Sequence, residues 1–231
     1  MSSFKSLSYF IFCLTLSSCA ITKQTIDETN VIYDKDYFKS QKNEAWLTSK
    51  RTAISFAKGD ANNCKGYLEL VKDSEIEESA KYQLIKSEYI ECEVLNLVKN
   101  SHAKTIEYQN TDELDGDIGK VLAEKLDLTS FNSSLGQLTL DNKKTLATIF
   151  PNTIRQHKNS LTIEDESRHF NLLLVAKAYI NNNQHSDWIL IVSDEILDGT
   201  YRSFATIIII DPETSQQSLL KAKSFLDIQK N

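Results

Sequence analysis

The chain has 231 residues, of which 32 are acidic and 26 basic, so its formal net charge is −6 at pH 7. This balance excludes a basic nucleic-acid-binding protein, and we expect no nucleic acid among its partners. Six glycines and two prolines exclude collagen-like and Pro/Gly-rich disordered classes and leave little material for phosphate-binding loops.

The first 18 residues have the pattern of a secretory signal peptide. Lys5 precedes an apolar run of about 11 residues, and small residues follow that run. A membrane-spanning helix needs about 20 apolar residues, so the run is too short for a permanent span. We therefore expect residues 1–18 to be removed on export.

The end of this segment, Leu16, Ser17, Ser18 and Cys19, resembles the lipobox of bacterial lipoprotein precursors. The resemblance covers only the first twenty or so residues. It implies that Cys19 receives a diacylglyceryl group, becomes the first mature residue and is N-acylated, for example with palmitate. Stable anchoring needs at least two acyl chains, so acylated Cys19 would hold the protein on a membrane. Ala20, where inner-membrane retention typically has aspartate, implies an outer-membrane location facing the periplasm.

The mature chain is predicted to begin with a tether and to continue as helices. Residues 19–35 are polar and have no sustained period, which favours a flexible tether. Residues 36–128 are predicted to be a helical region. In its first part, residues 36–58, apolar residues recur mostly one, three or four positions apart before Gly59 interrupts them. Ser74 and Glu77 form a capping box that starts a long helix. The expected helices cover 36–58, 63–71, 74–100 and 118–126.

The long helix allows two arrangements. Tyr82, Ile85 and Tyr89 have the spacing of the first helix of a tetratricopeptide repeat, but Lys86 occupies the position that needs a small residue. A helical hairpin explains the same residues, and we favour it.

Residues 129–231 are predicted to form an α+β region with an antiparallel sheet. Apolar runs of strand length lie at 172–180, 188–192, 201–210 and 219–225. Short turn-rich links such as Asp198-Gly199 join them, and strands joined this tightly must be antiparallel. The run from Ile207 to Ile210 is apolar on both faces, so we expect a central strand. The predicted fold class is α+β, with a helical N-terminal half of hairpins followed by this sheet.

Cys64 and Cys92 remain after acylation of Cys19. An exported protein meets an oxidising compartment, so these two cysteines are predicted to form a disulfide. The loop between them has about 28 residues, for which chain entropy gives roughly 3.5 kcal/mol of stabilisation. The alternative is a pair of buried, reduced thiols on helix faces.

Motifs for metal-dependent or nucleophilic catalysis are missing. The four histidines are scattered, and no metal site is expected. Ser134 lies in a loop that lacks the first glycine of a serine-hydrolase elbow. Neither a P-loop nor a dinucleotide-binding turn is present, and we expect no cofactor. The stretch 112–119 fails as a calcium loop at both ends, so Asp115 or Asp117 is expected to cap a helix.

Acidic clusters are the remaining candidates for catalysis. Glu164, Asp165 and Glu166, like Asp194, Glu195 and Asp198, could pair as acid and base, although most such clusters are solvated edges.

We therefore expect a non-enzymatic, membrane-anchored envelope lipoprotein, structural or adaptor in role, whose partner is another envelope component such as a protein. The alternatives are a hydrolase that acts on an envelope polymer or peptide through paired carboxylates, and a small-molecule carrier with a large apolar pocket.

Overall fold

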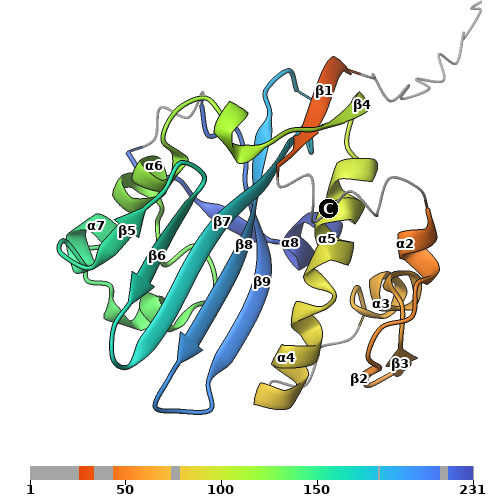
Figure 1. Cartoon of the computed structure of the whole chain (residues 1–231), viewed down its shortest axis with the longest axis horizontal. Coiled ribbons are helices and arrows are strands. Elements are labelled where there is room, and N and C mark those ends of the chain that lie inside the picture. Colours follow the sequence, from red (N-terminus) through yellow and green to blue (C-terminus); the bar gives the residue numbers. More distant parts are fainter. Residues whose placement is uncertain (1–25, 34–43, 74–78, 182, 214–217, 231) are drawn as a thin grey trace, which may run out of the picture.

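The computed structural model of the chain describes residues 26–33, 44–73, 79–181, 183–213 and 218–230 (Figure 1). The predicted signal peptide, the Cys19 acylation site and the Ser74-x-x-Glu77 capping box lie outside these residues. The strands are β1 (Ile26–Ile32), β2 (Ile54–Phe56), β3 (Gly59–Ala61), β4 (Ala103–Tyr108), β5 (Ile154–Gln156), β6 (Ser160–Glu164), β7 (Arg168–Ala178), β8 (Asp187–Ile196), β9 (Arg202–Ile209) and β10 (Ala222–Ser224). The α-helices are α2 (Ala45–Thr48), α3 (Cys64–Leu70), α4 (Ala80–Ser87), α5 (Ile90–Lys99), α6 (Ile118–Lys125), α7 (Leu146–Ile149) and α8 (Phe225–Gln229).

An eight-stranded mixed sheet forms the centre of the described part of the chain, with the order β10-β9-β8-β7-β1-β4. The sheet branches at β7, because its first half pairs with β6 and its second half pairs with β1 along the same edge. Strand β5 extends the sheet beyond β6. The pairs β7–β8, β8–β9 and β9–β10 are antiparallel, as the sequence predicted, whereas β1 and β4 are parallel.

Both faces of the sheet are buried, and each has its own hydrophobic core. In β9, Ile208 packs toward α5, whereas Ile207 and Ile209 belong to the core on the opposite face, which includes residues of α6 and α7. The β8 side chains alternate in the same way. The predicted central position of the run 207–210 is confirmed, because β9 pairs with β8 on one side and with β10 on the other over Ile207–Ile209.

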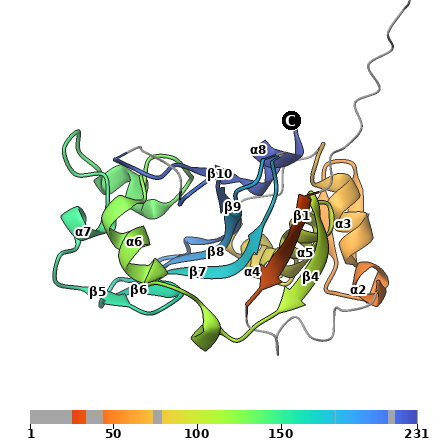
Figure 2. The same cartoon turned by 90° about the horizontal axis from the view of Figure 1, so that it is seen from above.

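Figures 1 and 2 show helices at both ends of the molecule, with α4 and α5 next to the sheet between them. Helices α6 and α7 lie at one end, whereas α2 and α3 lie at the other end, beyond α5. Helix α6 begins at Asp117, whose Oδ1 accepts a hydrogen bond from Lys120 N at 3.0 Å, so the predicted cap is confirmed. Gly119 lets this helix approach the chain between β5 and β6, because a Cβ there would lie 2.2 Å from the carbonyl oxygens of His157 and Ser160.

The prediction of a helical N-terminal half built from hairpins is wrong. Only a short helix, α2, lies in the described part of the expected helix 36–58, and Ile54 and Phe56 belong to strand β2. These two side chains are buried and Ser55 between them is exposed, which is the period of a strand. Gly59 has φ +145° and follows the turn between β2 and β3, so it does not end a helix.

The helices that the structure does form in this half are short. Helix α3 confirms the expected helix at 63–71. Helices α4 and α5 together cover most of the expected long helix, but they follow one another along the chain and do not fold back as a hairpin (Figure 1). Strand β4, which the sequence analysis missed, then returns the chain to the sheet.

The predicted tether over 19–35 is also too long. Ile26–Ile32 form strand β1, which pairs with β4 and β7, and Ile32 is fully buried. The buried Asn30 fixes this strand, because its Nδ2 donates to Val98 O and Ser101 Oγ and its Oδ1 accepts from Tyr179 N. Residues 26–32 therefore belong to the folded body and not to a tether.

Candidate functional site

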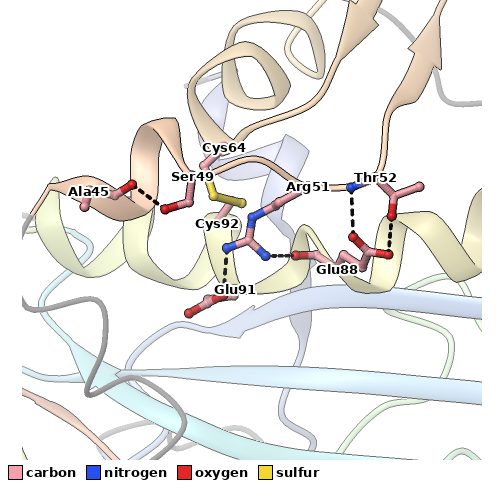
Figure 3. A network of polar contacts seen from close by, with 8 residues as sticks. All are labelled: Ala45, Ser49, Arg51, Thr52, Cys64, Glu88, Glu91 and Cys92. Atoms are coloured by element: carbon pink, nitrogen blue, oxygen red, sulfur yellow. Dashed lines mark hydrogen bonds and ion pairs between the residues drawn. A yellow bond between two sulfur atoms is a disulfide. The ribbon is translucent and has the colours of Figure 1, made fainter.

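The predicted disulfide is present and joins α3 to α5. Cys64 and Cys92 are both fully buried, and their Cα atoms lie 5.3 Å apart (Figure 3). Residues 44–73, which hold α2, β2, β3 and α3, are called the stapled segment below. The disulfide ties this segment to the helix that covers one face of the sheet.

A polar network reinforces this attachment (Figure 3). The Arg51 guanidinium donates to Glu88 O and, at 2.8 Å, to Glu91 Oε2. The Glu88 carboxylate accepts hydrogen bonds from Thr52 N at 3.1 Å and from Thr52 Oγ1 at 2.8 Å. The side chains of Arg51 and Glu91 are only 14% and 9% exposed. Because they form an ion pair, each of these buried charges is compensated by the other. The arrangement is typical of a structural attachment.

The acidic residues near 164–166 are held individually and form no acid-base pair. Glu164 lies 3.2 Å from Arg155 in an ion pair. Asp165 accepts hydrogen bonds from Ser167 N, Ser167 Oγ and Arg168 N, and the Ser167 bonds lower the pKa of its carboxyl group. Both carboxylates therefore belong to a turn and a sheet edge.

The second acidic cluster is dispersed as well. Asp194 is fully buried and accepts hydrogen bonds from Ser134 N at 2.6 Å, Ser134 Oγ at 2.7 Å and Tyr201 Oη at 3.1 Å. Glu195 forms an ion pair with Arg202 at 3.2 Å. Burial and the Asp194 charge raise the pKa of Tyr201 to about 12. Asp194 thus fastens the Ser134 loop to the sheet.

A different pair of carboxylates, Asp187 and Asp211, lies together near the start of β8 and the end of β9. Asp187 is fully buried and accepts hydrogen bonds from the backbone N–H groups of Ile180, Asn181 and Asp211. Burial raises its pKa to about 6, and the nearby Asp211 charge adds to this rise. Because the Asp187 oxygens are enclosed by backbone donors, this pair does not face a substrate-binding cleft.

Strand β9 has one edge without a neighbouring strand over half of its length. It pairs with β8 from Arg202 to Ile209, but β10 pairs only with Ile207–Ile209 on the other side. In the described residues, helix α4, and no strand, lies beside the outer edge of Arg202–Thr206 (Figure 1). The N–H of Phe204 points outward, since it donates to Gln83 Oε1 of α4 at 3.4 Å. The backbone groups of Arg202 and Thr206 point the same way, because alternate residues of a strand share an edge.

A groove of about 920 Å³ surrounds this edge and is called the β9 groove below. On one side it is lined by Phe131, Ala205 and Ile207, which pack with the core near α6. On the other side it is lined by Val71 and Phe225, which belong to the core near α5. The groove therefore continues around the edge of the sheet from one face to the other.

Two polar groups in the wall of the β9 groove lack the partners that buried groups normally have. Glu93 of α5 is 3% exposed and accepts a hydrogen bond from Tyr67 Oη at 2.5 Å, but no lysine, arginine or histidine of the described residues forms an ion pair with it. Burial and the Glu93 charge raise the pKa of Tyr67 well above its usual value. Thr206 is 2% exposed, and its Oγ1 has no hydrogen-bond partner within the described part of the chain.

The sequence analysis did not find this site. A signal for Glu93 exists, because it lies among buried apolar residues of α5 such as Ile90, Val94 and Leu97. A glutamate at such a position needs a partner or a function. Thr206 stands at the start of the apolar run that forms the end of β9, and nothing in the sequence separates it from an ordinary strand residue.

The described residues contain neither a membrane-spanning helix nor a metal-binding cluster. No helix in them is long and apolar enough to span a bilayer, and no three histidine, cysteine, aspartate or glutamate side chains gather in a way that could hold a metal ion. In comparisons with known proteins, no family model, no curated protein and no solved structure matches the chain.

Proposed function

We propose that the protein is a lipid-anchored component of a bacterial cell envelope that binds an extended segment of another envelope protein at the β9 groove. The anchor is the acylated Cys19, and the lack of an aspartate at residue 20 supports the outer membrane, with the folded body in the periplasm. The observation that carries the binding role is the free edge of β9 over Arg202–Thr206, bordered by a groove.

A free strand edge binds extended chains through backbone hydrogen bonds. Folded proteins usually cover or shorten their edge strands, because unpaired N–H and C=O groups recruit other strands. Here β10 pairs with only three residues of β9, and helix α4 covers the rest of this edge, with Gln83 Oε1 accepting from Phe204 N–H at 3.4 Å. A partner segment that displaces α4 from the edge extends the sheet, while the groove accommodates its side chains.

The groove lining favours binding over hydrolysis. Glu93 is the one acid among the described residues that line it, whereas an acid-base hydrolase needs two carboxylates in one cleft. The mixed polar and apolar lining also differs from the apolar pocket that a small-molecule carrier requires.

The anchor is tested by replacing Cys19 with serine. The thioether-linked lipid cannot form on serine, so we expect Cys19→Ser protein to appear in the soluble fraction without added lipid mass. Fractionation of cells that express each form, followed by mass spectrometry, makes the comparison. If Cys19→Ser protein stays in the membrane fraction to the same extent as the parent, the lipid anchor is wrong.

The binding edge is tested by photo-crosslinking in the native membrane. A photoreactive amino acid at Arg202, on the free edge, should crosslink to a partner polypeptide. The same group at Lys120 of α6, whose side chain is 59% exposed at the far end of the molecule, serves as the matched control. Equal crosslinking from both positions, or none from residue 202, would contradict the proposed binding edge.

A further inference from the structure

The chemistry of the β9 groove indicates which segment it selects, and this inference rests on the proposed binding role. The polar side of the groove contains Glu93, and its neighbour Glu91 provides a direct comparison. Both are buried, but Glu91 has the Arg51 guanidinium at 2.8 Å, whereas Glu93 has the neutral Tyr67 hydroxyl. A buried carboxylate without a cation is costly to the folded protein, and a cation supplied by a ligand offsets that cost.

Thr206 completes the polar side. Thr206 lines the same groove as Glu93, and its buried Oγ1, which has no partner within the described part of the chain, can accept a hydrogen bond. An ammonium or guanidinium group has several N–H donors, so it can donate to the Glu93 carboxylate and to Thr206 together. A neutral or anionic side chain would leave the carboxylate uncompensated.

Apolar side chains line the groove on the opposite face as well, as Val71 and Phe225 do on the face of Glu93. Phe131, Ala205 and Ile207 line it, and Ile207 is almost completely buried. An aliphatic or aromatic ligand side chain would gain from the removal of its apolar surface from water there. The two sides lie on opposite faces of the β9 edge.

Strand geometry connects the two sides. In an extended chain, successive side chains point to opposite faces of the sheet. A segment added alongside Arg202–Thr206 would therefore place one side chain against Phe131 and Ile207 and the adjacent one toward Glu93. We propose that the β9 groove selects an extended peptide segment in which a lysine or arginine adjoins a large apolar residue.

The charges at the groove rim do not reverse this preference. The Arg202 guanidinium lies 3.2 Å from Glu195, so its charge is compensated. Lys86 of α4 also lines the groove and opposes a cationic ligand, but it is more exposed than Glu93 and is better screened by water. Lys86 thus provides a control, because its replacement by glutamine should strengthen binding of a cationic segment.

The test uses the purified, lipidated full chain in detergent micelles and four synthetic peptides. Each peptide is a short, β-branched, extended host sequence with a central Leu-Lys, Leu-Gln, Leu-Glu or Gly-Lys pair. We expect the Leu-Lys peptide to bind about tenfold more tightly than the Leu-Gln peptide, because a charged hydrogen bond is lost in the latter. The Gly-Lys peptide should also bind about tenfold more weakly, because the apolar contact is lost.

Substitutions assign these differences to the groove. Glu93→Gln should abolish the preference for lysine over glutamine while the Leu-Gln peptide still binds. Thr206→Val, which is nearly isosteric, should weaken Leu-Lys binding several-fold, and Lys86→Gln should strengthen it. Thermal unfolding of each variant shows whether the fold persists, and Thr206→Val carries the test if Glu93→Gln does not fold.

The outcomes separate this inference from the proposed function. Equal binding of the Leu-Lys, Leu-Gln and Leu-Glu peptides would overturn the selectivity and leave the binding edge in place. No binding by any peptide, together with no crosslinking from residue 202, would overturn both. If the chain self-associates and Glu93→Gln abolishes this association, the inference is also overturned, because the occupant of the β9 groove would then be a second copy of the chain.

Discussion

Helix α5 carries two neighbouring glutamates whose surroundings differ. On the side of the stapled segment, Glu91 pairs with Arg51, and the disulfide of Cys92 lies next to it. Glu93 lines the groove and is at least as deeply buried, but it accepts a hydrogen bond from Tyr67 of the same stapled segment and has no cation among the described residues. The first region satisfies its polar groups internally, as a structural attachment should. The second leaves a charge and a hydroxyl without their usual partners, as a binding site can.

The largest expected effect comes from opening the disulfide on the stapled side. Replacing Cys64 and Cys92 together by serine should lower the free energy of unfolding by about 3.5 kcal/mol, because the closed 28-residue loop restricts the unfolded chain. Urea denaturation measures the change. Reductant should destabilise the parent protein by a similar amount and leave the double variant unaffected. If reductant leaves the unfolding free energy of the parent protein unchanged, the disulfide does not form.

The next effect concerns the buried ion pair. Arg51→Ala leaves Glu91 buried without its cation, so we expect a loss of about 3 kcal/mol in unfolding free energy. Adding Glu91→Gln to this variant should recover part of the loss, because the uncompensated charge is then removed. Urea denaturation of the two single variants and the double variant measures the coupling. Additive losses would show that the pair contributes nothing as a unit.

A smaller effect is expected in the pH dependence of stability. It comes from the buried carboxylate of Asp187, which lies in neither the stapled segment nor the β9 groove. Its pKa of about 6 in the folded protein exceeds the 3.8 of the free side chain, so the folded state binds the proton more tightly. Its contribution to stability is complete below about pH 4 and is lost as the pH rises through 6, a fall of about 2 kcal/mol. Unfolding free energies between pH 4 and 7 should show this slope in the parent and a flatter one in Asp187→Asn. Parallel slopes would contradict the raised pKa.

The sequence predicted strands β7 to β10 because their signals are local, but it did not predict β5 and β6. The β8 and β9 runs are strongly apolar, the Asp198-Gly199 turn joins them, and short connections force antiparallel pairing. Strands β1 and β4 were missed because their pairing is not local: Thr29 lies opposite Thr105, and both strands are polar enough to resemble connections. The first part of the stapled segment, through β2, was misassigned because Ile54 and Phe56 fit a helical spacing as part of a longer apolar pattern.

The candidate site was less predictable than the fold. The disulfide followed from the number of cysteines and the expected compartment, and the structure confirms it. The β9 groove depends instead on the shortness of β10 and on where α4 lies, and both are tertiary properties. Sequence patterns show that Glu93 is unusual on an apolar helix. They do not show that Arg51 forms an ion pair with Glu91 and that Glu93 is left without a cation among the described residues.

The most direct test measures stability and binding in the same Glu93→Gln protein. Glutamine keeps an oxygen that can accept from the Tyr67 hydroxyl and removes the buried charge, so the free energy of unfolding should rise by about 1 kcal/mol. Calorimetric titration of the same preparation should show about tenfold weaker binding of the Leu-Lys peptide. Opposite changes in stability and affinity are the predicted result. A less stable variant that binds the peptide as tightly as the parent would show that Glu93 is a structural residue.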